Sequence, residues 1–70
     1  MSIHWKLIFT DNNLQRITVL KNLLEANDIP AQIINKIDSS YPSIGSAELY
    51  ADGSRLDEAL ELIKKAEGEE

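Results

Sequence analysis

The spacing of apolar residues switches repeatedly along this 70-residue chain, and the order of those switches leaves few folds open. Every second residue is apolar from Ile3 to Phe9, which is typical of a β-strand with one apolar face. Over residues 11–28 the apolar residues instead recur every three or four positions, as on an amphipathic helix. We expect further strands at 30–35 and 47–51 and a second helix at 55–66.

Capping residues mark the boundaries of both predicted helices. The first helix begins after an N-cap supplied by Asp11, Asn12 or Asn13. Pro30 cannot continue a helix, so we expect this helix to end near Ala26. In the second helix, Ser54 and the carboxylate of residue 57 have the spacing of a capping box, which places the helix start there.

The predicted order of elements is β-α-β-β-α, which is an α+β fold. A right-handed crossover places the first helix over the sheet, and the third strand forms a hairpin with the second. If the third strand lies between the other two, the antiparallel sheet has the order 1-3-2 with both helices on one face. This is a ferredoxin-like sandwich without its usual fourth strand. We expect one domain over residues 1–66 and a frayed acidic tail at 67–70.

The apolar positions of these elements predict the core between the sheet and the helices. The residues expected there are Trp5, Leu7, Phe9, Ile17, Leu20, Leu24, Ile29, Leu49, Leu56, Ala59, Leu60 and Ile63. His4 and Trp5 could instead mark a ligand pocket. A tryptophan on the inner face of a strand beside a polar neighbour is more often core, and we adopt that interpretation.

The composition argues against several functional classes. With no cysteine and one histidine, the chain offers no disulfide framework, no thiolate nucleophile and no zinc site, so we expect no metal and no cofactor. A formal net charge of −5 with scattered basic residues argues against nucleic acid. The N-terminal residues lack the apolar run of a signal peptide or a membrane span, so we expect a cytoplasmic protein.

Catalytic groups are scarce as well. Ser39 and Ser40 could act as nucleophiles, but His4 is the only histidine and lies far from them in the sequence. The acidic residues of the second helix recur at the spacing of a solvated polar face rather than as an acid and base pair. We therefore expect that the protein is not an enzyme.

The connection at 36–45 is longer and more polar than a hairpin needs, since about two to five residues suffice. Turn chemistry can explain part of it, because Asp38 can form an Asx-turn and Gly45 allows a positive φ. Alternatively, its hydroxyls and amides bind a polar group. The candidate ligand-binding or partner-binding residues are Asn35, Lys36, Asp38, Ser39, Ser40 and Tyr41.

Two surfaces of the predicted sheet lack a cover. The first strand is an edge with unpaired backbone groups, and the sheet face away from the helices is open. Either surface could pair with a second copy of the chain, so we expect a homodimer. The candidate dimer-surface residues are Lys6, Ile8 and Tyr50.

Several segments resemble a family of small bacterial domains of unknown function, the prokaryotic signal transducing proteins. The segments are WKLIFT, LLEANDIPA, IINKIDSSY and AELY, and the resemblance extends from Trp5 to about Lys65. The most specific of them is NKIDSSY. The resemblance implies a fold similar to the nitrogen-regulatory PII proteins, which are ferredoxin-like and oligomeric. This chain departs from them in lacking the last strand and in having a shorter loop, so nucleotide binding is not carried over.

Together, these features favour a non-enzymatic regulatory module of the signal-transducing type. It would recognise a partner protein or a small polar metabolite through the loop 36–45 and the sheet surface. The alternative is a structural or accessory interaction domain without a ligand of its own, whose polar loop only shapes the fold.

Overall fold

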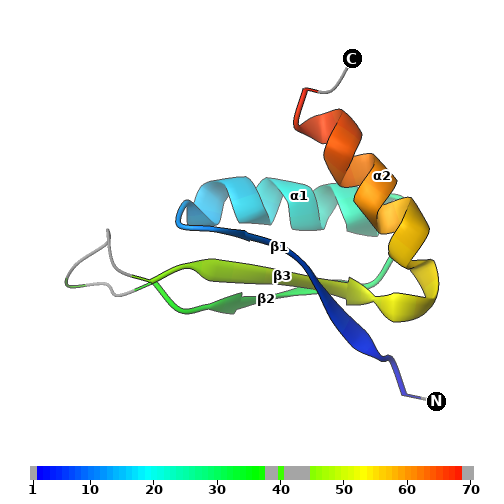
Figure 1. The fold of residues 1–70 in the computed structure, drawn as a ribbon, viewed down its shortest axis with the longest axis horizontal. Coiled ribbons are helices and arrows are strands. Elements are labelled where there is room, and N and C mark those ends of the chain that lie inside the picture. Colours follow the sequence, from blue (N-terminus) through cyan, green and yellow to red (C-terminus); the bar gives the residue numbers. More distant parts are fainter. Residues whose placement is uncertain (1, 38–39, 41–44, 69–70) are drawn as a thin grey trace.

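The computed structural model describes residues 2–37, 40 and 45–68 (Figure 1). The predicted order β-α-β-β-α is confirmed. The elements are β1 (Trp5–Asp11), α1 (Leu14–Ala26), β2 (Ala31–Asn35), β3 (Ala47–Asp52), the 3-10 turn η1 (Gly53–Arg55) and α2 (Leu56–Ala66).

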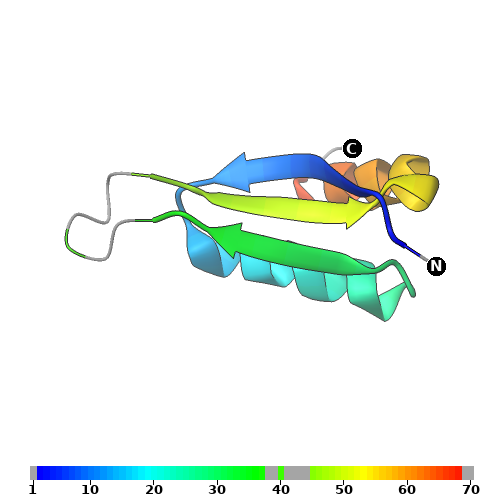
Figure 2. The same ribbon diagram turned by 90° about the horizontal axis from the view of Figure 1, so that it is seen from below.

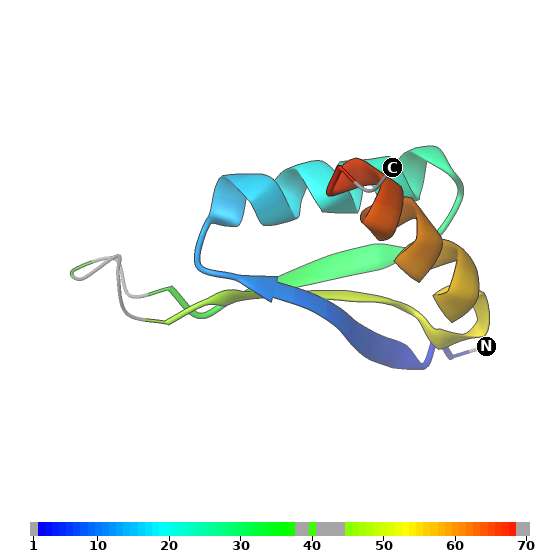
Figure 3. The same cartoon turned by 45° about the horizontal axis from the view of Figure 1, so that its top comes forward.

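The three strands form one antiparallel sheet in which β3 lies between β1 and β2. Both helices lie on the same side of this sheet (Figure 1), and Figure 2 looks onto the other side, where the described residues place no helix. The ends of β2 and β3 that lead into residues 36–46 lie opposite the N-terminus (Figure 3). The predicted α+β architecture with sheet order 1-3-2 and two helices on one face is therefore confirmed.

The core lies between the sheet and the two helices. Its buried residues are Ile17, Leu20, Leu24, Ile29, Ala31, Ala47, Leu49, Ala51, Ala59 and Ile63. On β3 the inward positions are Ala47, Leu49 and Ala51, so small side chains flank the one large one and let the helices approach the sheet. Phe9 packs against this core and is partly buried, while Leu56 is also partly buried.

A β-bulge overturns the predicted inner face of β1. Trp5 pairs with Asp52 and Leu7 with Tyr50, but Phe9 pairs with Leu49, so the register shifts between Leu7 and Phe9. Residues directly opposite each other share a face of the sheet. Trp5 and Leu7 therefore lie on the uncovered side and are 37% and 50% exposed. The prediction that they are core was wrong, because the alternating pattern does not reveal the inserted residue.

Ile8 and Leu60 also lie on unexpected sides. Ile8 was expected on the uncovered side of the sheet, but at the bulge it packs against the core. Leu60 was expected in the core, yet it is 44% exposed, because Ala59 and Ile63 form the buried side of α2.

The caps of α1 follow the sequence closely. Asn13 is the N-cap, and its Oδ1 accepts hydrogen bonds from the backbone N–H groups of Gln15 and Arg16 at 3.0 and 3.3 Å. The helix ends at Ala26, as predicted, and Asp28 follows in the left-handed region with φ 63°.

The start of α2 differs from the predicted capping box. Asp52, not Ser54, is the capping residue: its Oδ1 accepts from both the backbone N–H and the hydroxyl of Ser54, each at 2.9 Å. These bonds cap the start of η1. Helix α2 follows from Leu56 and has no side-chain cap of its own. Both Asp52 and Ser54 suit an N-cap, so the sequence pattern alone does not choose between them.

Candidate functional site

The uncovered side of the sheet is the most distinctive surface of the domain, and we call it the open face (Figure 2). Strand register decides which side chains it carries, since the positions between the buried residues of β3 point outward. The open face consists of Trp5, Leu7, Thr10, Gln32, Ile34, Glu48, Tyr50 and Asp52.

Exposed apolar side chains occur on β1 and just before it. Trp5 and Leu7 of the open face are 37% and 50% exposed, and Ile3, which precedes β1, is 40% exposed; we call these three residues the apolar stripe. On β2, Ile34 is 40% exposed. Single exposed apolar residues are ordinary in proteins, but a contiguous apolar patch with polar neighbours is typical of an interaction site.

A polar cluster occupies the opposite end of the open face, beside the loop 36–45. Lys36 Nζ lies 3.4 Å from Glu48 Oε1, and the Tyr50 hydroxyl donates a 2.9 Å hydrogen bond to the same carboxylate. That hydrogen bond to Glu48 raises the pKa of Tyr50, because the bond requires the protonated phenol. Glu48 thus fixes both side chains at the base of the loop.

The two ends of the loop are held together by the backbone. The N–H of Lys36 donates to the carbonyl of Ser46 at 2.9 Å and joins the two ends. Within the first end, the side-chain Oδ1 of Asn35 accepts from the N–H of Ile37 at 2.9 Å. Gly45 has φ +92°, and a Cβ there would clash with the carbonyl oxygen of Lys36. Only glycine fits this close approach.

The predicted binding residues of the loop are only partly within the described residues. Asn35 and Lys36 lie at its base as above, and Ser40 is exposed. Asp38, Ser39 and Tyr41 lie outside the described residues, so their role in binding stays a prediction.

The predicted dimer-surface residues do not share one face. Tyr50 lies on the open face, whereas Ile8 packs against the core. Lys6 is opposite Ala51, a buried position on the helix side of the sheet, and its stem passes close to Gly53. These three residues therefore do not form one surface, and of them only Tyr50 lies on the open face.

A hollow lies where β1 begins and β3 ends, and it includes His4, for which a ligand pocket was the alternative to core packing. It has a volume of about 370 Å³ and is lined by Ser2, Ile3, His4, Asp52 and Ser54. The N–H of Gly53 donates to the carbonyl of His4 at 2.8 Å and so closes this end of the sheet. The backbone N–H of Ser54, followed by its hydroxyl, lowers the pKa of Asp52, so the hollow contains a carboxylate.

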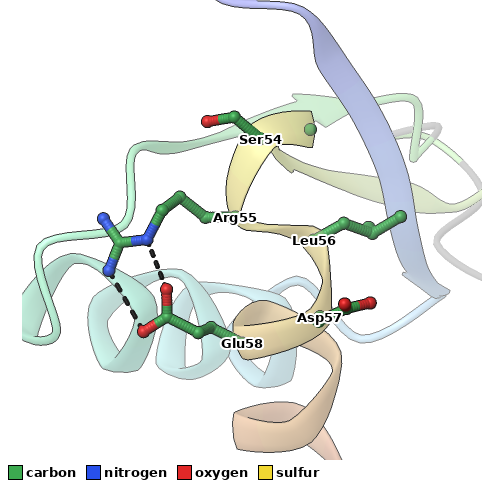
Figure 4. Close-up of a pocket in the computed structure, with 6 residues that line it drawn as sticks. Ser54, Arg55, Leu56, Asp57 and Glu58 are labelled. Carbon is green, nitrogen blue, oxygen red and sulfur yellow. Dashed lines mark hydrogen bonds and ion pairs between the residues drawn. The ribbon is translucent and has the colours of Figure 1, made fainter.

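A second hollow, of about 270 Å³, lies at the start of α2, where Arg55 and Glu58 face each other (Figure 4). Arg55 Nη2 donates to Glu58 at 3.2 Å, and Arg55 Nη1 donates to the backbone carbonyl of Asp28 at 3.0 Å. The pair lowers the pKa of Glu58, mainly through the hydrogen bond from Arg55. Arg55 therefore connects α2 to the turn after α1, which is a structural role.

The described residues contain neither a metal-binding cluster nor a membrane-spanning helix. Among residues 2–37, 40 and 45–68, no three histidine, aspartate or glutamate side chains gather closely enough to hold a metal ion. In the same part of the chain, the helices are too short and too polar to cross a bilayer.

Comparison with known families agrees with the motifs found in the sequence. Residues 5–67 match the model of a family described as putative prokaryotic signal transducing protein. This is the family that the sequence resembles, so that prediction is confirmed. Neither the curated proteins nor the solved structures that were searched give a match.

Proposed function

We propose that this chain, which belongs to the family of prokaryotic signal transducing proteins, is a non-enzymatic binding module whose open face and adjoining loop recognise a partner protein. The observation that carries the proposal is the apolar stripe on a sheet side that no helix covers among the described residues. Its exposed Trp5 and Leu7 are buried when a partner packs on this side.

The energetics favour a macromolecular partner for this face. Burial of apolar surface contributes about 25 cal/mol per Å², so the face gains from an occupant that covers several side chains at once. Small ligands are usually bound in concave pockets with few, well-placed polar groups. The open face is instead an extended sheet surface with apolar residues at one end and the Lys36–Glu48 ion pair at the other. A small polar metabolite remains the second candidate, with the loop as its site.

Paired variants test the proposal with matched chemistry. Leu7→Ser removes an apolar side chain from the open face, and Leu60→Ser removes a similarly exposed one, 50% against 44%, from α2. The tagged proteins are incubated with lysate of the source organism, and bound proteins are quantified by mass spectrometry. We expect a protein that the parent and Leu60→Ser capture equally and that Leu7→Ser loses. Equal recovery by both variants, with unfolding curves matched, contradicts the proposal.

The loop is tested separately, because its residues are distinct from those of the apolar stripe. Ser39→Ala combined with Ser40→Ala should leave the unfolding free energy nearly unchanged and abolish capture of the partner. If the double variant loses stability and keeps every interaction, the loop is structural and the accessory-domain alternative holds. Differential scanning fluorimetry against a metabolite library tests whether a small polar metabolite binds. A ligand present at 100 times its Kd raises the free energy of unfolding by about 2.7 kcal/mol.

We also propose a homodimer formed through the outer edge of β1, and a cytoplasmic location. Among the described residues β1 pairs only with β3, so its other edge has backbone groups available to a strand of a second copy. Pairing at this edge extends the sheet and leaves the open face of each copy accessible.

A further inference from the structure

We infer that the partner segment on the open face presents an arginine, whose guanidinium is bound between the indole of Trp5 and the carboxylate of Asp52. This inference rests on the proposed function and specifies the chemistry of the partner. The site lies at the end of the open face where β1 begins and β3 ends, next to the hollow lined by His4 and Ser54.

The strand register brings the two groups together. Trp5 and Asp52 are directly opposite each other in the β1–β3 ladder, so their side chains share the open face, with Cβ atoms about 5 Å apart. An aromatic face attracts a cation within about 6 Å of its centroid, and a carboxylate accepts charge-assisted hydrogen bonds from a guanidinium. Arginine is the side chain that satisfies both groups at once, because it stacks and donates in one plane.

The charge of Asp52 is only partly offset within the domain: besides the bonds from Ser54, the nearby charges of Arg55 and His4 help to lower its pKa. Its Oδ1 accepts both bonds from Ser54, which orient the carboxylate without supplying a cation. None of the ion pairs between described side chains includes Asp52. Arg55, the last residue of η1, instead donates its hydrogen bonds to Glu58 and to the backbone carbonyl of Asp28.

The whole molecule favours the same kind of occupant. The chain has a formal net charge of −5, and a negative field attracts a basic segment and speeds its encounter. A second copy on the open face is disfavoured, because the outward residues of β3 are Glu48, Tyr50 and Asp52. Two such faces packed along β3 place carboxylates against carboxylates. The apolar stripe favours an apolar occupant, and the carboxylates of β3 favour a basic one, so we expect a segment that has both kinds of side chain.

The rows of side chains also define the spacing in the partner. Trp5 faces Asp52, and two residues further along β1 Leu7 faces Tyr50. An extended segment presents alternate residues on one side, with the same period as the sheet. An arginine at Trp5 therefore places the side chain two positions away on Leu7, where an apolar residue fits.

Tryptophan fluorescence tests this site directly, since Trp5 is the only tryptophan in the chain. The probe is an acetylated and amidated peptide, Ser-Arg-Ser-Leu-Ser-Ile-Ser, titrated into the full-length protein. The control peptide has citrulline in place of arginine, which keeps the shape and removes the charge. We expect saturable changes in Trp5 emission with at least about tenfold weaker binding of the citrulline peptide, since a charged hydrogen bond contributes more than about 1.4 kcal/mol.

Two variants of the protein complete the experiment. Asp52→Asn removes the charge but keeps an oxygen that can accept from Ser54, and it should lose about tenfold in affinity for the arginine peptide only. Asp57→Asn makes the same charge change on an exposed position of α2 and should bind as the parent does. The citrulline comparison uses the parent protein, so it holds even if Asp52→Asn fails to fold.

Three results overturn the inference. They are equal binding of the two peptides, no response of Trp5 to either peptide, and an emission change that follows protein concentration alone, which assigns the site to a second copy. If both peptides bind equally and Leu7→Ser weakens both, the open face binds apolar segments without reading charge. The proposed function then stands while this inference fails.

Discussion

At the scale of single residues, the caps show what a sequence can and cannot predict. Asn13 lies within the three residues expected to cap α1, because a polar run before a helical pattern admits few choices. Asp52 was missed, because Ser54 two residues later is an equally good cap by type, and only the geometry of η1 selects Asp52. Trp5 and Asp52 face each other because two strands that are distant in the chain pair in the sheet. No local sequence pattern indicates that pairing.

Asp52 gives a prediction for the dependence of stability on pH. The bonds from Ser54 lower its pKa below the ordinary value of 3.8 in the folded state. Its contribution to the free energy of unfolding is therefore complete above that ordinary value and is lost as the pH falls through the lower folded pKa. In urea unfolding between pH 2 and pH 5, the free energy of unfolding should fall less steeply with decreasing pH in Asp52→Asn than in the parent. An identical slope in the two proteins contradicts this role.

At the scale of elements, the hydrophobic period predicts the type and order of helices and strands but not every face. In α1 the pattern predicts the buried side, and Ile17, Leu20 and Leu24 are buried as expected, whereas in α2 the predicted core residue Leu60 is exposed. In β1 one inserted residue moves Trp5 and Leu7 to the open face, and nothing in the composition of WKLIF signals it. The strand that carries the candidate site is thus an element whose sequence pattern predicted the wrong face.

Two of the leucines predicted for the core, Leu24 and Leu60, provide a matched test of these faces. Leu24→Ala removes a fully buried side chain and should lower the unfolding free energy by about 2 to 5 kcal/mol. Leu60→Ala removes one that is 44% exposed and should cost less than about 1 kcal/mol. The comparison uses urea denaturation monitored by circular dichroism. Equal losses for the two variants contradict the observed side of α2.

At the scale of the whole molecule, the domain is a two-layer sandwich with one side of its sheet uncovered by the described residues. A chain of 70 residues buries only about 60% of its unfolded surface, so we expect marginal stability and a gain from any partner that covers apolar area. The sequence predicted the architecture and the family correctly. It did not locate the open-face site, because that site depends on a bulge and on pairing across strands.

The homodimer is a prediction at this scale. Pairing through the edge of β1 requires backbone groups that the described residues leave without a neighbouring strand. Sedimentation velocity at micromolar concentrations should give a dimer whose fraction rises with concentration. Ile8, which packs against the core, is no longer expected to be a dimer contact, and a charge there should unfold the domain instead. A strictly monomeric species at high concentration contradicts the dimer.

Site-specific photo-crosslinking tests most directly whether the open face is the recognition surface. A benzophenone amino acid replaces Gln32, which lies on the open face opposite Tyr50, or Thr18, which is exposed on α1. Irradiation of cells that produce each variant, followed by mass spectrometry, identifies the proteins bound to each position. We expect a specific crosslinked partner from position 32 and none from position 18. A partner crosslinked from position 18 and absent from position 32 contradicts the account.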